Sequence, residues 1–282
     1  MRSSPDISAA PFGAFAPDGW AYLVMATFSF DRPHRTWPLH RKLAKRWLRA
    51  SEKAYDVCFR GLRLRLLPSS NAGDEGIVLN GIHGEEDEFD RVIERVAEYD
   101  NFIDIGANIG LYSMLAGRIL PPDRPIIAFE PAPDTFERLK THLAFNGMSD
   151  RVTVINAAVA EAPGELALFR PPHNQGGTSA TKRFDHWQEI KVSKVTLADA
   201  LNDLGIDHIG MLKIDIEGFE DSALLPYFDV MPPKAWPRYI LTEVCHRRFW
   251  KRDLVAELRA FGYREVYSNQ RNIHFALDEG RA

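Results

Sequence analysis

Apolar residues after position 100 fall into short runs separated by longer amphipathic segments. The short runs predict buried strands at 102–106, 126–130, 152–156, 209–214 and 239–244. The segments between them predict helices at about 109–118, 134–146, 196–204 and 218–225. Strands that alternate with helices are typical of a mostly parallel sheet with helices on both faces. The pattern therefore predicts an α/β domain over residues 100–282.

Two insertions depart from this alternation. Apolar and polar residues alternate at 165–169 and 190–195, which predicts an extra β segment before the fourth core strand. The polar stretch 173–179 inside it is either a lid over the substrate or a plain connector. Alternation at 263–267 and 272–277 predicts an antiparallel hairpin that completes the sheet.

The N-terminal 37 residues differ from the rest in composition. Residues 1–37 are rich in Pro, Ser, Ala and Gly, which predicts a flexible arm. The apolar run Gly19–Phe30 is too short to span a bilayer and is bordered by Asp18 and Asp31. It also lacks the basic residues that precede a secretory signal. We therefore expect a cytoplasmic protein.

Residues 38–99 are predicted to form an extension that packs over the ligand-binding cleft of the main domain and helps to shape the acceptor side of that cleft. Residues 38–55 predict a basic amphipathic helix, with apolar positions at Leu39, Leu43, Trp47 and Leu48 and basic positions at Arg41, Lys42, Lys45, Arg46, Arg49 and Lys53. We expect this helix to pack on its own domain and leave its charges in water. The alternative is contact of residues 38–53 with an anionic membrane surface or a phosphorylated substrate. Tyr55 to Leu67 predicts two strands around Gly61, and Glu85 to Tyr99 predicts a second helix.

Composition narrows the class of protein. Hydrophobic residues make up 45% and charged residues 26% of the chain, which is enough apolar material for a large core. The net charge of −4 gives no overall attraction to nucleic acid, so we expect no nucleic-acid partner. Cys58 and Cys245 are far apart, which excludes a disulfide framework and a C-x-x-C zinc site.

The clearest chemical signal is the stretch Phe102–Gly110, with the sequence FIDIGANIG. An apolar strand ends there in a glycine turn that opens into a helix. We expect Gly106 and Gly110 to let a ligand approach the backbone, and the helix N-terminus to offer free N–H groups. Glu130 ends the next strand, where a carboxylate can accept both hydroxyls of a ribose. The two features together predict a nucleoside-cofactor site.

The residues of the turn favour one nucleoside cofactor over another. A dinucleotide fingerprint requires glycine at positions 108 and 111, which here are Asn108 and Leu111. Asp104 adds an acid that suits the ammonium group of an amino-acid tail, which predicts S-adenosylmethionine. Asn156 and Ala157 end the third strand, where Asn156 is either an adenine contact or a turn residue.

Several motifs in order resemble the FkbM-type methyltransferases. These are Asp104-x-Gly106-Ala107-Asn108-x-Gly110, Ala128-Phe129-Glu130-Pro131-x-Pro133, Leu212-Lys213-Ile214-Asp215-Ile216-Glu217-Gly218-x-Glu220, Thr196-Leu197-Ala198-Asp199-Ala200-Leu201 and Leu241-Thr242-Glu243. Ala198 departs from the family pattern. The resemblance spans about residues 100–246 and implies the Rossmann-like class I methyltransferase fold, S-adenosylmethionine as cofactor, and methylation of hydroxyls on sugars, glycolipids or polyketides.

Acidic residues that follow the fourth and fifth core strands are the catalytic candidates. Asp215 is our first choice for a base or an anchor of the acceptor hydroxyl, and Glu217 is the second. Alternatively, both acids cap the helix that starts near Gly218. Glu243 and His246 could reach the same pocket, and His246 titrates near neutrality.

A metal site and other functions remain as alternatives. Asp215, Glu217, Glu243 and His246 could together bind a divalent metal, but no segment has a spacing that requires one, and we predict none. The sequence thus predicts three parts. They are a flexible arm (residues 1–37), an N-terminal extension (residues 38–99) and an S-adenosylmethionine-binding methyltransferase domain (residues 100–282). The predicted activity is O-methylation of a small-molecule or glycan acceptor. The alternatives are N-methylation of a small molecule and a non-catalytic nucleoside- or glycan-binding module.

Overall fold

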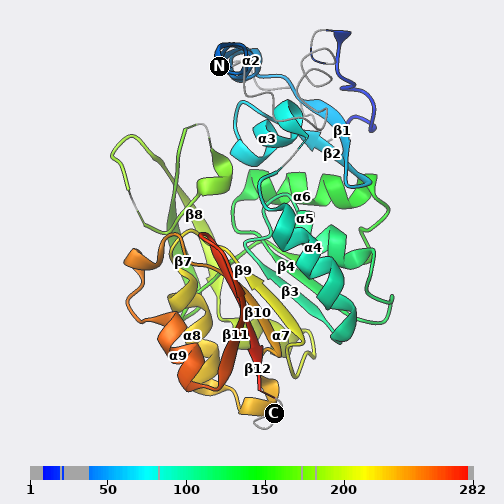
Figure 1. Ribbon diagram of the computed structural model, residues 1–282. Helices are drawn as coiled ribbons and strands as arrows, with labels where there is room; N and C mark the ends of the chain where they lie inside the picture. Colours follow the sequence, from blue (N-terminus) through cyan, green and yellow to red (C-terminus); the bar gives the residue numbers. More distant parts are fainter. Residues whose placement is uncertain are drawn as a thin grey trace.

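The computed structural model describes residues 9–19, 21, 38–81, 83–172, 174–181 and 183–278 (Figure 1). Most of the predicted arm 1–37 and most of the apolar run Gly19–Phe30 lie outside these ranges, as does His173 of the predicted lid. Within the ranges, no helix is long and apolar enough to cross a membrane.

A seven-stranded sheet with the order β11-β12-β10-β9-β3-β4-β5 forms the centre of the molecule. Its strands are β3 (Phe102–Ile105), β4 (Ile126–Phe129), β5 (Thr153–Ile155), β9 (Met211–Ile214), β10 (Tyr239–Glu243), β11 (Tyr263–Ser268) and β12 (Asn272–Leu277). All neighbours from β10 to β5 are parallel, whereas β12 runs antiparallel between β10 and β11. The order confirms the predicted α/β sheet with a closing antiparallel hairpin.

Helices cover both faces of this sheet and create two hydrophobic cores. They are α5 (Leu111–Gly117), α6 (Pro133–Phe145), α7 (Leu197–Asp203), α8 (Glu220–Val230) and α9 (Leu254–Ala260). Residues of α5 and α6 pack in one core, and those of α7, α8 and α9 pack with Ile103 and Ile105 in the other. Every residue of β3, β4, β9 and β10 is buried, because strands covered on both faces have no solvent side.

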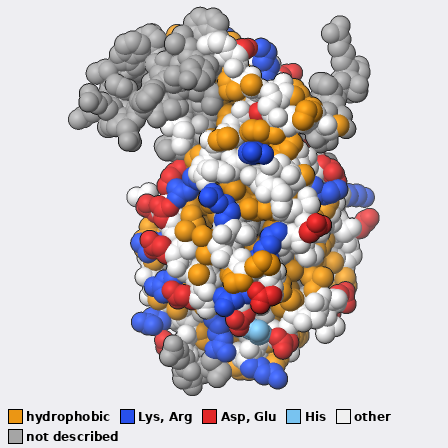
Figure 2. Space-filling model, turned by 90° about the vertical axis from the view of Figure 1, so that its right-hand side faces the viewer, with side chains coloured by type: hydrophobic (Ala, Val, Ile, Leu, Met, Phe, Trp, Pro, Cys, Tyr) orange, Lys and Arg blue, Asp and Glu red, His pale blue; other side chains and the backbone are white. Residues whose placement is uncertain are grey.

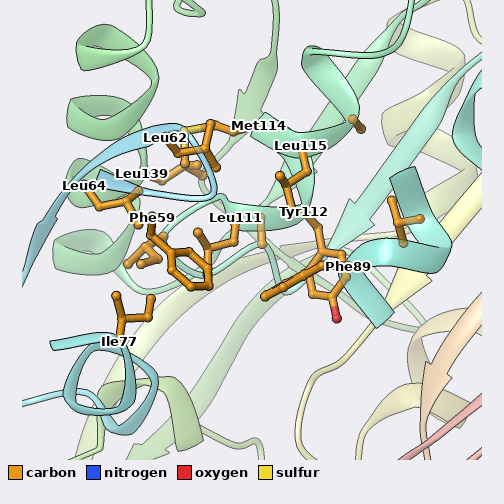
Figure 3. Packing of buried hydrophobic residues seen from close by; sticks show 14 of the residues in the cluster. Phe59, Leu62, Leu64, Ile77, Phe89, Leu111, Tyr112, Met114, Leu115 and Leu139 are labelled. Atoms are coloured by element: carbon orange, nitrogen blue, oxygen red, sulfur yellow. The ribbon is translucent and has the colours of Figure 1, made fainter. Parts of the chain in front are cut away.

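Residues 38–99 extend the first of these cores. They form α2 (Pro38–Ser51), β1 (Tyr55–Phe59), β2 (Leu62–Leu66), α3 (Ala72–Asn80), α4 (Glu86–Arg95) and a 3₁₀ turn η1 (Val96–Glu98). Strands β1 and β2 pair as the predicted hairpin. Figure 3 shows Phe59, Leu62 and Phe89 of this extension packed against Leu111, Met114 and Leu139 of α5 and α6. The boundary at residue 99 remains a prediction.

Helix α3 was not predicted. Its apolar spacing is interrupted by Gly73 and Gly76, which weaken a helix. Local capping compensates for them: Asn71 accepts from the N–H groups of Gly73 and Asp74, and Gly81 ends the helix with φ 68°.

The outcome for α2 differs from the prediction. Ala44 and Leu48 are buried, but Leu43 is 56% and Trp47 37% exposed. The prediction of a single apolar face that includes Leu43 and Trp47 is therefore wrong. Among the described residues, the helix packs on the domain along the side that carries Ala44 and Leu48. The side chains of Leu39 and Arg41 are outside the described part of the chain.

The insertion forms a separate three-stranded sheet with the order β6-β8-β7. It consists of β6 (Ala158–Val159), β7 (Gly164–Arg170) and β8 (Gln188–Val195), with a 3₁₀ turn η2 (Gln175–Gly177) between β7 and β8. The loop between β7 and β8 reaches the start of α3, where the Ala72 N–H donates to Asn174 Oδ1 at 3.2 Å. Just before that helix, the Gln175 N–H donates to the Ser70 carbonyl at 2.7 Å. These contacts bring the predicted lid next to the N-terminal extension.

Candidate functional site

A cavity opens at the carboxyl ends of β3, β4 and β9. With its solvent-open mouth it contains about 990 Å³ of space between the side chains. The predicted residues that line it are Gly106, Ala107, Asn108, Glu130, Ala157, Asp215 and Glu217. Those outside the lining are Asp104, Gly110, Asn156, Glu243 and His246.

The glycine turn is fixed by packing of the protein on itself. Gly106 has φ 78°, and a Cβ built there would lie 2.1 Å from the backbone oxygen of Asp215. A Cβ on Gly110 would lie 2.3 Å from Leu139 Cδ1. We expected these glycines to make room for a ligand, but the atoms nearest to the built Cβ positions belong to the chain itself. The turn therefore depends on close contact between the ends of β3 and β9.

Glu130 is a buried carboxylate held in a fixed orientation. Its Oε2 accepts from the Asn108 N–H at 3.0 Å, and its Oε1 accepts from the Ala132 N–H at 2.9 Å. Burial raises its pKa to about 7, although these two N–H groups oppose the shift. Since each carboxylate oxygen has two lone pairs, one on each oxygen remains for a ligand hydroxyl.

Asp104 lies beneath the turn and does not reach the cavity. It is fully buried, accepts from Ser113 Oγ at 2.6 Å, and pairs with Lys213 Nζ at 3.3 Å. Lys213 also donates to the Gly106 carbonyl at 2.7 Å. The expected direct contact of Asp104 with a ligand ammonium group is therefore not available in this arrangement. Asp104 instead supports the turn through Lys213, a residue to which the sequence analysis assigned no role.

Four buried polar atoms in the cavity lining lack a hydrogen-bond partner among the described residues: His83 Nδ1, Asn108 Oδ1, Thr135 Oγ1 and Gln175 Oε1. Unsatisfied buried polar atoms are costly and usually indicate a missing ligand or water. Together with Glu130, they could accept from the ammonium, hydroxyl and amino groups of S-adenosylmethionine. The hydrogen-bond acceptors of the cavity therefore fit this cofactor.

Asn156 holds the backbone after β4. Its Nδ2 donates to the carbonyls of Glu130 at 2.8 Å and Pro131 at 3.0 Å. Of the two roles that the sequence analysis considered for Asn156, these bonds match that of a turn residue. The neighbouring Ala157 lines the cavity, as do Ala158 and Val159 of β6.

Asp215 and Glu217 reach the cavity from a turn. Strand β9 ends at Ile214, and Glu217 has φ 60°, so the strand geometry does not continue through both acids. Burial and the nearby Asp215 raise the pKa of Glu217 to about 7, and Arg183 opposes the shift. Arg183 Nη2 donates to the Glu217 carbonyl at 2.6 Å and lies 3.3 Å from Oε2.

The predicted alternative role of these acids in capping α8 is wrong, because the N-cap residue of α8 is Phe219 and no side chain forms a cap hydrogen bond there. The turn before the helix is instead held by Glu220. Glu220 Oε1 accepts from the N–H groups of Ile216 and Gly218 at 3.0 and 3.1 Å, and Oε2 accepts from Trp250 Nε1 at 2.6 Å. Glu220 is therefore occupied by structural contacts. Asp215 and Glu217 remain directed to the cavity lining.

Glu243 and His246 lie beside Glu217, outside the cavity lining. His246 Nδ1 is 3.2 Å from the Oε2 atoms of both Glu217 and Glu243. Burial, followed by the charges of Asp215 and Glu217, raises the pKa of Glu243 well above its usual range. Ligand atoms of these three residues lie within 4.8 Å of one another, as do those of a second group, Asp215, Glu220 and Glu243. The arrangement could hold a divalent metal.

The sequence analysis expected the extension to pack over the cleft but did not name the residues that reach it. His83, Glu85 and Phe89 line it, and Tyr112 of α5 donates to Glu85 Oε2 at 2.9 Å. No local pattern marks these residues, because they reach the cavity only through packing of the extension on α5. Arg183 was also missed, although it belongs to the polar insertion.

Comparison of the sequence with known proteins identifies the family to which this chain belongs. The methyltransferase FkbM domain family matches residues 104–265. The 31-O-demethyl-FK506 methyltransferase FkbM of Streptomyces tacrolimicus is 29% identical over 196 residues, covering 59% of this chain and 74% of that protein. Methyltransferase sdnD of Sordaria araneosa is 29% identical over 147 residues, 42% of this chain and 56% of that protein. This chain thus spans little more than half the length of the latter relative.

Another relative and two solved structures share a lower sequence identity with this chain. The hexuronic acid methyltransferase AglP of Haloferax volcanii is 26% identical over 147 residues, 50% of this chain and 56% of that protein. A crystal structure of methyltransferase FkbM from Methylobacillus flagellatus is 17% identical with a TM-score of 0.41, covering 63% of this chain and 44% of that chain. An O-methyltransferase of Bacillus cereus in complex with SAH is 9% identical with a TM-score of 0.41, covering 91% and 99% of the two chains.

Proposed function

Because this chain belongs to the FkbM methyltransferase family, we propose that it transfers a methyl group from S-adenosylmethionine to a hydroxyl of a sugar, glycolipid or secondary metabolite. The observation that carries the proposal is the cavity at the ends of β3, β4 and β9, where Glu130 and unsatisfied polar atoms come together. The names of two relatives, which refer to an O-demethylated FK506 and to a hexuronic acid, favour a hydroxyl-rich acceptor.

Glu130 and the glycine turn are proposed to bind the cofactor. The Glu130 carboxylate is held by two backbone N–H groups and is free to accept the two ribose hydroxyls. Asn108 Oδ1, which is buried without a partner among the described residues, would accept from the ammonium group. Asp104, Gly106, Ala107, Gly110, Asn156 and Ala157 complete the proposed set, several of them by supporting the turns.

Asp215 and Glu217 are proposed to act on the acceptor. S-adenosylmethionine, when bound, supplies a methyl group attached to a positively charged sulfur. The acceptor oxygen must be held about 3 Å from the reacting carbon. Asp215 is proposed to anchor the hydroxyl, and Glu217, with a pKa of about 7, to receive its proton as the carbon–oxygen bond forms and the carbon–sulfur bond breaks. Glu243 and His246 are proposed to position Glu217.

The extension is proposed to shape the acceptor side. His83, Glu85 and Phe89 line the cavity from that part of the chain. They provide an apolar ring together with hydrogen-bonding groups, which suits a sugar or a polyketide. In Figure 2, basic and acidic side chains are interspersed over the described part of one face and form no continuous basic stripe. This supports a small or glycan acceptor rather than a nucleic acid.

Binding and turnover can be tested separately. Calorimetry with S-adenosylhomocysteine should give micromolar affinity, as a rough expectation, that falls at least tenfold in Glu130→Ala. Glu137→Ala, at an exposed glutamate in α6, is the matched control. A cell extract with isotopically labelled cofactor should then yield a metabolite heavier by one methylene group. Unchanged affinity in Glu130→Ala would refute the ribose contact.

The labelled product also separates the alternatives. A label on nitrogen would indicate an N-methyltransferase. Tight binding of S-adenosylhomocysteine without labelled product from any extract fraction would favour a binding module.

A further inference from the structure

Helix α2 contacts the rest of the described chain along one side only. Ala44 and Leu48 are buried on that side. Glu75 of α3 pairs with Lys45 Nζ at 2.6 Å and with Arg49 Nε at 2.5 Å. These contacts fix the helix on α3 and leave its opposite side facing outward.

The outward side is basic. Lys42 and Arg46 lie one turn apart, are exposed, and form no ion pair with any described residue. The helix has the sequence PLHRKLAKRWLRAS, with five Lys or Arg residues and no acid, in a chain of net charge −4. Figure 1 shows α2 at the end of the molecule opposite the C-terminus. This end of the molecule therefore carries a helix that is basic throughout, although the chain as a whole is slightly acidic.

Two large apolar side chains accompany these charges. Leu43 is 56% and Trp47 37% exposed, and they are one turn apart on the flank next to Arg46. An acidic peptide or a nucleic-acid backbone would neutralise Lys42 and Arg46 but would leave Leu43 in water. A bilayer surface can contact both the apolar and the basic side chains. Trp and Leu enter the headgroup region, and Lys and Arg bind anionic lipid headgroups.

From this combination we propose that α2 is a binding surface for bilayers that contain anionic phospholipids. The occupant is the lipid surface itself, contacted by Lys42, Leu43, Arg46 and Trp47. This property goes beyond methyl transfer and does not depend on it. The sequence analysis gave such contact as the alternative to packing on the domain; α2 packs on the domain through Ala44 and Leu48 and still leaves Leu43 exposed.

Vesicle co-sedimentation with the full chain tests the proposal. Vesicles of phosphatidylcholine mixed with phosphatidylserine should bind the protein, and vesicles of phosphatidylcholine alone should bind it far less. Since one basic residue near such a surface contributes roughly fivefold in affinity, the double variant Lys42→Glu/Arg46→Glu should bind at least about 25-fold more weakly. Trp47→Ser should lose roughly tenfold at high ionic strength, where the electrostatic part is screened.

A matched control is Lys191→Glu/Lys234→Glu, which reverses two exposed lysines elsewhere and changes the net charge equally. Far-ultraviolet circular dichroism and binding of S-adenosylhomocysteine report whether each variant is folded. Equal vesicle binding by the α2 variant and the control overturns the proposal, as does failure of the unmodified protein to bind phosphatidylserine vesicles. Tighter binding to single-stranded RNA than to vesicles, unaffected by Trp47→Ser, assigns the surface to nucleic acid and also overturns it.

Discussion

Arg183 Nη1 lies 2.9 Å from His246 Nε2. A guanidinium group can only donate, so Nε2 accepts and the ring proton of neutral His246 resides on Nδ1. Nδ1 in turn faces the Oε2 atoms of Glu217 and Glu243, both at 3.2 Å. Burial and the charge of Arg183 lower the pKa of His246, which keeps the ring neutral. Arg183 of the insertion and His246, which follows β10, thus both contact Glu217.

Arg183→Gln should shift the pH dependence of turnover. Arg183 opposes the rise in the pKa of Glu217, so its removal raises that pKa further. If Glu217 must be ionised to accept a proton, the acidic limb of the kcat/KM profile moves to higher pH. Arg183→Lys should restore part of the shift, and Arg264→Gln, at an exposed position, should leave the profile unchanged. A limb that stays in place in Arg183→Gln would exclude this coupling.

Isosteric replacement separates the two catalytic candidates. Loss of a general base costs roughly 10²–10⁴-fold in rate. We expect Glu217→Gln to lower kcat by that factor with little change in S-adenosylhomocysteine affinity. Asp215→Asn should raise KM for the acceptor as well as lower kcat, because Asp215 is proposed as the anchor. A full rate in Glu217→Gln would transfer the role of the base to Asp215.

Cofactor affinity should weaken as the pH falls below about 7, the pKa of Glu130. The protonated carboxyl loses acceptor capacity for the ribose hydroxyls. The same raised pKa affects stability with a definite sign: the folded protein holds an extra proton between the ordinary glutamate pKa and about 7, so stability falls as the pH rises through that window. Calorimetry of Glu130→Gln should show no such pH dependence of affinity, and its persistence would assign it to another group. Melting curves of the same variant should lose only part of the stability dependence, because Glu217, with a pKa of about 7, contributes with the same sign.

Chelators should have little effect on turnover. The cluster of Glu217, Glu243 and His246 already contains an internal donor, Nδ1–H of His246, and a cation, Arg183. We therefore expect the rate in excess EDTA to stay within about twofold of the untreated rate. A larger loss that added Mg²⁺ or Mn²⁺ reverses would show that a metal occupies this cluster.

Gly106→Ala should destabilise the fold more than the same change at Gly147. Both glycines have positive φ, 78° and 66°, so the cost of the left-handed backbone is similar. At Gly106 the new Cβ would also meet the Asp215 carbonyl at 2.1 Å, whereas at Gly147 no atom lies within 4 Å. The overlap adds about 1–3 kcal/mol, measurable by denaturant unfolding. Equal destabilisation would mean that the β3–β9 contact relaxes freely.

The sheet could be predicted because four of its strands, β3, β4, β9 and β10, are buried on both faces. Such strands have to be short apolar runs, and helices have to separate them when they are parallel. Glu130 was found for the same reason: a polar residue that directly follows a buried strand lies at the ligand-binding edge. The structure confirms the sheet and brings Glu130 to the cavity lining.

Helices α3 and α9 and the long-range contacts were not predicted. Helix α9 is only seven residues long and depends on Asp253, which accepts from the Ala256 N–H. Lys213 and Gly106 are separated by 107 positions, and Arg183 and His246 by 63. No periodicity in one segment encodes a partner in another. The burial of Asp104 was missed because the strand pattern does not show which polar residue a buried lysine will pair with.

The amino-acid sequence by itself determined the strand and helix alternation, the family motifs and the carboxylates at the strand ends, because these depend on local spacing and on burial along one segment. Only the tertiary structure decided which of those residues line the cavity, which of them support its turns, and that Leu43 and Trp47 face outward. Those outcomes depend on which surfaces meet when distant segments pack, and packing selects one side of each element by shape and charge.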